Sequence, residues 1–262
     1  MEILREVFVV NRTFNDSKPP SINLNGYKIF SGNLTQISFS EKAIINTINQ
    51  NAYCVAEIED NLFKESLQSS DILLPDGIGV VIAVRFLFGI KIKKIAGYNL
   101  HNYLLKQLNQ KSGSCFYLGS SESNLQKISN RLQHEFPNIR VGTFSPPYKA
   151  VFSEEDNRQM LSIINAFKPD VLFIGMTAPK QENWVHMHKQ QIDAKLICSI
   201  GAAFDFFAGT IKRPSKRWRK LGLEWFIRLI REPKRMRRRY LYYGPIFIFI
   251  LMKLKLKMLF NK

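Results

Sequence analysis

The chain has 262 residues, of which 45% are hydrophobic and 23% are charged. A chain of this size and composition can bury a substantial core in one domain without crosslinks. Its three cysteines lie far apart inside apolar segments, which predicts buried thiols and a reducing compartment. The first residues, MEILREVF, include acidic side chains where a secretory signal needs positive charge, so we expect no secretion.

The net charge of +17 is concentrated in the last fifth of the sequence. Residues 212–262 contain 17 Lys and Arg against 2 Asp and Glu, whereas residues 1–211 contain 21 against 19. These basic residues are interspersed with Trp, Tyr and the apolar run IFIFILM, which is too short to span a bilayer. Basic residues are attracted to anionic lipid, and aromatic residues are stable at the level of the lipid headgroups. The tail therefore predicts peripheral docking on an anionic membrane. Duplex nucleic acid offers no apolar surface, so we expect no nucleic-acid partner.

Residues 1–40 are rich in Asn, Ser and Pro and predict an irregular or short-stranded N-terminal cap. Beyond residue 43, apolar stretches with strand character alternate with helical patterns, and the apolar helix expected over 78–89 should be buried. Strands are predicted within 71–77, 115–119, 138–148, 169–176 and 195–207, and helices within 78–89, 120–136, 153–167 and 180–191.

Strands separated by helices of this length predict an α/β fold with a mainly parallel sheet that helices flank on both faces. We expect a single Rossmann-like catalytic domain, with its N-terminal cap, over residues 1–211. A basic helical appendage that docks on membrane should follow over residues 212–262. Ligands are then expected at the carboxyl ends of the strands.

Three loops at the expected strand ends carry polar groups that a core does not need. In LLPDGIGVV, Asp76 either caps the following helix or acts as a general base whose pKa apolar neighbours raise. In GMTAPKQENW, Gly175 would let the backbone approach a ligand. Gln181 and Glu182 begin a helix whose N-terminus favours an anion. The alternative is that this loop is an ordinary turn with a helix cap. In YLGSSESN, Gly119 and the hydroxyls after it form a weaker candidate phosphate cradle, because the GxGxxG and GxxxxGK[ST] patterns are absent.

Several segments together resemble one family. TINQNAY, LLPDGIGVVIAVRFLFG, KKIAGYNL, PDVLFIGMTAPKQENW and GLEWFIRLIREPKRMRRRYL occur in the order and approximate spacing of the WecG/TagA/CpsF glycosyltransferases, which form glycosyltransferase family 26. The resemblance covers residues 43–243. It implies an inverting, metal-independent enzyme that moves a sugar, often N-acetylmannosamine or its uronic acid, from a UDP-sugar donor to an undecaprenyl-diphosphate-linked saccharide. This polyprenyl-linked acceptor lies at the cytoplasmic face of the bacterial plasma membrane, and the products feed cell-surface polysaccharides.

The resemblance also implies roles for individual residues. Asp76 matches the proposed catalytic base of the DGxGV motif, and Thr47 and Asn49 match the TxN pair that lines the sugar pocket. Gln181 matches a glutamine near the donor, and Asn99 stands where many relatives have an aspartate, which bears on sugar selectivity. The basic tail matches an appendage that closes over the active site and meets membrane and diphosphate. Its candidate diphosphate ligands are Arg228, Arg231, Arg235 and Arg238.

An inverting sugar transfer needs a base for the acceptor hydroxyl and stabilisation of the departing diphosphate. The sequence has no DxD pair and no cluster of His, Asp and Glu with metal-ligand spacing, so we expect neither a metal nor another cofactor. Arginines and helix N-termini can supply the positive charge instead. Two alternatives without catalysis remain, a membrane-docked scaffold and a nucleic-acid-binding protein. The sequence leaves the oligomeric state open, a homo-oligomer included.

Overall fold

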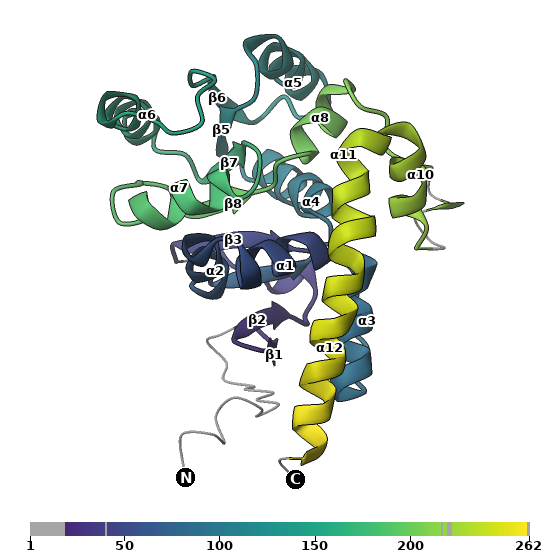
Figure 1. Cartoon of the computed structure of the whole chain (residues 1–262). Helices are drawn as coiled ribbons and strands as arrows, with labels where there is room; N and C mark the ends of the chain where they lie inside the picture. Colours follow the sequence, from purple (N-terminus) through teal and green to yellow (C-terminus); the bar gives the residue numbers. More distant parts are fainter. Residues whose placement is uncertain (1–18, 40, 216, 219–221, 261–262) are drawn as a thin grey trace.

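The computed structural model describes residues 19–39, 41–215, 217–218 and 222–260, and its centre is one eight-stranded sheet (Figure 1). The strand order is β1-β2-β4-β3-β8-β7-β5-β6. β1 runs antiparallel to β2, and the other neighbouring strands run parallel, as the sequence predicts. The strands are β1 (Ser21–Leu24), β2 (Tyr27–Phe30), β3 (Ala43–Ile48), β4 (Ile72–Pro75), β5 (Ser114–Gly119), β6 (Arg140–Phe144), β7 (Val171–Gly175) and β8 (Leu196–Ser199).

The N-terminal cap is short-stranded where the structure describes it; residues 1–18 and 40 lie outside the described part. β1 and β2 form a hairpin through Asn25 and Gly26, whose φ angles of 52° and 90° are those that a tight hairpin turn requires. Ile29 of β2 pairs with Leu73 of β4, so the hairpin extends the main sheet.

Helices cover both faces of the sheet, because consecutive strand residues point to opposite sides. In β5, Cys115 and Tyr117 pack into one hydrophobic cluster with residues of α4 and α5, and Phe116 and Leu118 pack into another with residues of α6 and α7. The helices are α1 (Gln50–Ile58), α2 (Asn61–Gln68), α3 (Ile78–Phe88), α4 (Gly97–Gln110), α5 (Glu122–Glu135), α6 (Glu154–Phe167), α7 (Lys180–His188), α8 (Ala203–Ala208), α10 (Glu224–Arg231), α11 (Pro233–Arg237) and α12 (Tyr243–Phe260), with a π-helical turn η3 (Arg238–Tyr242) and a 3-10 turn η2 (Leu34–Gln36).

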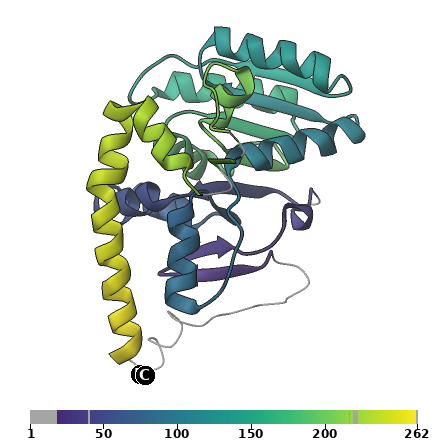
Figure 2. The ribbon, with the colours of Figure 1, turned by 90° about the vertical axis from the view of Figure 1, so that its right-hand side faces the viewer.

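The expectation that the helix over 78–89 is buried is wrong for one face of α3. Val80 and Val84 are buried, whereas Ile82 and Phe86 are 55% and 42% exposed. α3 lies at the outside of the molecule beside α12, so the sheet and its neighbours cover only part of its apolar surface (Figure 2).

The basic tail packs onto the rest of the chain through α12, which runs along α1 and α3 (Figures 1 and 2). Phe247 is 4% exposed and meets the ring of Tyr53 edge-on, with centroids 5.5 Å apart. The thiol of Cys54 donates a hydrogen bond to the carbonyl oxygen of Tyr243 over 3.5 Å. The tail therefore shares a hydrophobic cluster with residues of the sheet and of α1, α2 and α3. Within the described residues, no helix combines the length and the apolar character that crossing a membrane requires.

We predict that Phe247→Ala lowers the free energy of unfolding by about 3–5 kcal/mol, because it leaves a cavity in this shared cluster. Phe249→Ala is the matched control, since Phe249 lies on the same helix and is 70% exposed; it should change the value by no more than about 0.5 kcal/mol. Urea denaturation of both variants measures the difference. Equal unfolding curves for the two variants would show that α12 does not belong to the cooperative core. That result is expected if the chain folds as two independent parts divided at residue 212.

Candidate active site

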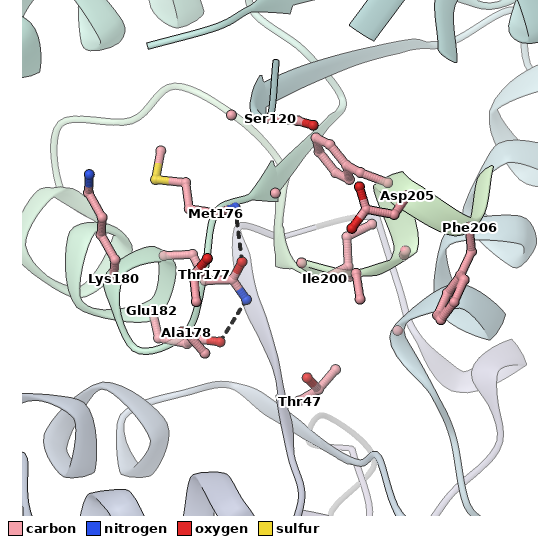
Figure 3. Close-up of a pocket in the computed structure, with 18 of the residues that line it drawn as sticks. Thr47, Ser120, Met176, Thr177, Ala178, Lys180, Glu182, Ile200, Asp205 and Phe206 are labelled. Carbon is pink, nitrogen blue, oxygen red and sulfur yellow. Dashed lines mark hydrogen bonds between the residues drawn. The ribbon is translucent and has the colours of Figure 1, made fainter. Parts of the chain in front are cut away.

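A cavity of about 1280 Å³ lies at the carboxyl ends of the parallel strands. Residues at the ends of β3, β4, β5, β6, β7 and β8, and in the loops that follow them, line it from the sheet side. The tail adds Glu224 and Arg228 from α10 and Arg239 from η3. Figure 3 shows Thr47, Glu182 and Asp205 around this hollow, on three different segments.

The cavity brings together eight of the twelve residues that the sequence predicts for the site. They come from strands far apart in the chain, because parallel strands end at a common edge of the sheet. These eight residues are Thr47, Asn49, Asp76, Gly119, Gly175, Gln181, Glu182 and Arg228. Their roles in catalysis and binding stay predictions.

Asp76 directly follows β4, and its backbone N–H donates to the carbonyl oxygen of Ile48 over 2.8 Å. The N-cap of α3 is Gly77, and no side chain caps that helix, so Asp76 is not the cap. Among the residues that the structure describes, none forms a hydrogen bond or ion pair with the Asp76 carboxylate. Its side chain is therefore free to accept a proton.

The pKa of Asp76 is raised above its ordinary value. Burial is the largest cause, and the nearby carboxylate of Glu224 adds to it, whereas Lys94, Arg213 and Arg228 act in the opposite direction. A carboxylate whose pKa is raised is a stronger base than an exposed one, which suits proton abstraction near neutral pH.

Thr47 and Asn49 come from the end of β3 and the turn after it. The side-chain oxygen of Asn49 caps α1 by accepting from the N–H groups of Asn51 and Ala52, at 3.0 and 3.1 Å. Asn49 therefore has a structural role as well as a place in the cavity wall. Asn99 does not line the cavity; its Oδ1 accepts from Nη2 of Arg213 over 3.4 Å.

Gln181 and Glu182 lie in the first turn of α7. The Oε1 atom of Gln181 accepts from the backbone N–H of Met176 over 3.1 Å, and its Nε2 donates to Oε1 of Glu182 over 2.8 Å; these are the dashed lines in Figure 3. Gln181 thus ties the loop after β7 to α7. Glu182 is only 2% exposed, and its other oxygen has no hydrogen-bond partner within the described chain. Burial raises the pKa of Glu182 to about 7, although the bond from Gln181 opposes this.

The two predicted glycines pack closely against their neighbours. A side chain at Gly175 would approach the ring of Phe204 to 2.4 Å, so packing as well as ligand access requires a glycine here. Gly119 has a φ of +109°, and a side chain there would come within 2.6 Å of the carbonyl oxygen of Gly175.

The structure separates the four predicted arginines. Arg228 lines the cavity, whereas Arg231 lines an adjoining cavity of about 550 Å³ and donates to the carbonyl oxygen of Lys212 over 3.1 Å. Arg238 lies outside the main cavity and pairs with Glu59 at 3.0 Å. Arg235 belongs to α11, but its side chain lies outside what the structure describes.

Sequence reasoning missed Arg213, Arg239 and Glu224, all of which line the cavity. The guanidinium of Arg213 lies over the ring of Tyr98, 4.8 Å from its centroid. A basic segment around Arg213 was visible in the sequence, but nothing in its spacing distinguishes this arginine from its neighbours. Across the described residues, no group of three or more His, Cys, Asp and Glu side chains could hold a metal ion.

We predict that Glu182 makes stability depend on pH. Its pKa is near 4.5 in the unfolded chain and about 7 in the fold, so the folded state binds one more proton between these values. The free energy of unfolding should then fall by about 3 kcal/mol relative to Glu182→Gln as the pH rises from about 4.5 to 7. Urea denaturation at several pH values measures this. Glu155→Gln, at an exposed position, is the control, and its free energy of unfolding should differ from the wild-type value by the same amount at every pH. The same constant difference for Glu182→Gln would contradict a raised pKa of the buried carboxyl.

Comparison with known proteins agrees with the geometry. The model of the glycosyl transferase WecG/TagA/CpsF family matches residues 29–260. A Bacillus subtilis (strain 168) protein named N-acetylglucosaminyldiphosphoundecaprenol N-acetyl-beta-D-mannosaminyltransferase is 32% identical over 196 residues, 75% of this chain and 74% of the relative. A Staphylococcus aureus (strain MW2) protein of the same name is 31% identical over 195 residues, 74% of each chain. The chain therefore belongs to the WecG/TagA/CpsF family and is a glycosyltransferase.

Proposed function

We propose that this protein transfers N-acetylmannosamine, or a related sugar, from a UDP-sugar to an undecaprenyl-diphosphate-linked acceptor during synthesis of bacterial cell-surface polysaccharide. The observation that carries the proposal is the unpaired carboxylate of Asp76 inside a cavity whose other wall is a set of arginines from the tail. The names of the relatives support the same substrates, since they specify a mannosaminyl group and a lipid-linked N-acetylglucosaminyl acceptor.

In the proposed reaction, Asp76 takes the proton from an acceptor hydroxyl. At the same time, the oxygen of that hydroxyl attacks the anomeric carbon of the donor sugar. The bond from that carbon to the β-phosphate oxygen breaks, and UDP leaves with the bonding electron pair. One displacement at one carbon inverts the anomeric configuration. The raised pKa of Asp76 supports its role as the base.

The departing diphosphate gains negative charge, which needs stabilisation in the transition state. Arg213, Arg228 and Arg239 line the cavity and can supply it through charge-assisted hydrogen bonds. The hydroxyls of Ser120 and Ser121, at the N-terminus of α5, can add hydrogen bonds there. These groups support transfer without a metal ion.

We propose peripheral docking at the cytoplasmic face of the plasma membrane, and the outer face of α12 supports contact with a bilayer. Ile248, Phe249 and Met252 are exposed on this helix, and Lys253 and Lys257 are exposed beside them. The neighbouring helix α3 runs beside α12 (Figure 2). Its Ile82 and Phe86 are also exposed. Apolar and basic side chains on one helical face suit the boundary of an anionic bilayer.

We predict that Asp76→Asn lowers the transfer rate by about 10²- to 10⁴-fold, because the amide cannot accept the proton. UDP binding and thermal unfolding should stay near the wild-type values. Asp193→Asn, at an exposed position, is the matched control and should keep full activity. Transfer of labelled sugar from UDP-N-acetylmannosamine to a short-chain polyprenyl-diphosphate acceptor measures the rate, and EDTA should leave the wild-type rate unchanged. Near-normal turnover by Asp76→Asn would reject this base.

We predict that the double variant Lys253→Gln/Lys257→Gln binds anionic vesicles about 30-fold more weakly, since each basic residue contributes roughly 1 kcal/mol at such a surface. Phe249→Ser should reduce the part of the binding that persists at high salt. Co-sedimentation with phosphatidylglycerol-containing vesicles at low and high salt measures both effects. The control Lys106→Gln/Lys127→Gln removes the same charge from the exposed surface of α4 and α5. An equal loss in the control would show that only net charge matters.

A further inference from the structure

Glu224 is one of only two acidic residues in the basic tail, and it lies inside the cavity. It is the first residue of α10, and its side chain is 13% exposed. Its Oε2 lies 2.6 Å from Nζ of Lys94, and its Oε1 lies 3.4 Å from Nε of Arg213. One carboxylate therefore joins two cations from separate segments of the chain.

Both of these cations lie near Asp76. Lys94 precedes Ile95, whose backbone N–H donates over 3.0 Å to the carbonyl oxygen of Pro75, the residue before Asp76. Arg213 lowers the pKa of Asp76, as Lys94 does, which shows that both charges act on it. Neither forms an ion pair with Asp76 among the contacts of the described residues, and both contact Glu224.

Glu224 also fixes the helix that carries Arg228. The two residues are four apart in α10, so they lie on the same face of the helix one turn from each other, and both line the cavity. The pair with Lys94 connects α10 to the loop between α3 and α4, which belongs to the sheet side of the cavity. Glu224 thus links the helix that carries Arg228 to the sheet side of the cavity.

We propose that Glu224 is a positioning residue of the transferase: it fastens α10 across the cavity, which places Arg228 at the diphosphate, and it engages Lys94 and Arg213 so that Asp76 stays unpaired. This inference rests on the proposed function, in which Asp76 is the base.

The charges around Asp76 give this role a measurable signature. Burial raises the pKa of Asp76, Glu224 raises it further, and Lys94, Arg213 and Arg228 lower it. The charge of Asp76 in turn raises the pKa of Tyr240 in η3, although burial is the larger cause there. Burial would raise the pKa of Glu224 as well, but the pairs with Lys94 and Arg213 outweigh burial and hold that pKa below its ordinary value. Glu224 is therefore ionised at neutral pH. Because the base must be deprotonated, activity falls as the pH drops through the pKa of Asp76.

The test is the acid limb of kcat/KM against pH for the full-length protein. Glu224→Gln should move this limb to lower pH, because the charge of Glu224 acts on Asp76 more strongly than the opposing charge of Arg228. It should also reduce kcat/KM at neutral pH by about 10- to 100-fold, because Arg228 is displaced. Lys94→Gln should move the limb to higher pH, and the double variant should return it toward the wild-type position. Glu155→Gln should leave both limb and rate unchanged.

A limb that stays at the wild-type pH in Glu224→Gln would overturn the inference, as would shifts of Glu224→Gln and Lys94→Gln in the same direction. A merely structural role lowers the rate and the thermal midpoint without moving the limb. Asp76→Asn keeps the two proposals apart. If this variant retains the wild-type rate, the proposed base is wrong; if it is inactive while Glu224→Gln leaves the limb in place, only the role of Glu224 fails.

Discussion

The packing of α12 against α1 and α3 is the interaction on which the active site depends. The tail carries most of the net positive charge of the chain, and mutual repulsion opposes its compaction. Burying a side chain such as Phe247 or Leu251 contributes about 1.5–3 kcal/mol. The exposed pair of Arg238 with Glu59 contributes little, because solvent screens it. Apolar burial therefore holds the tail, and α10 and η3 can lie over the cavity because α12 is anchored.

This anchoring divides the chemistry between two parts of the chain. The sheet presents the carboxylate of Asp76, and the tail presents the guanidinium groups of Arg228 and Arg239. A base and a set of cations in one cavity tend to pair, which would neutralise the base. Here burial raises the pKa of Asp76 while the cations lower it, and burial is the stronger effect. In the proposed reaction, the site can therefore hold positive charge for a diphosphate and still retain a usable base.

The sequence predicts the parallel sheet and the strand-end residues well, because both follow from local patterns. The alternation of apolar strands and amphipathic helices determines the sheet, and Asp76 is visible as a carboxylate immediately after a buried strand. The arginines of the tail were harder to place. Arg228, Arg231, Arg235 and Arg238 are spaced as one stripe of a continuous helix, and such a stripe would face a single site.

The backbone breaks that stripe at two points. Glu232 has φ −131° and ψ 58°, which ends α10, and Pro233 then begins α11. The π-helical turn η3 follows, and its wider turn changes the face on which later residues lie. As a result Arg239 lines the cavity while Arg238 contacts Glu59. Apart from Pro233, the sequence gives no sign of the end of α10 or of the π-helical turn. A family motif alone could therefore not predict which of these arginines line the cavity.

α12 is apolar on two opposite faces, and the two faces have different partners. A helix that is apolar all round is normally buried all round. In α12 the face with Phe247 and Leu251 is covered by the protein, whereas the face with Phe249 and Met252 is open and has lysines beside it. An open apolar face of this kind marks an interaction surface. Because this helix also anchors the tail residues that line the cavity, the proposed contact of its open face with lipid would couple membrane attachment to the position of those residues.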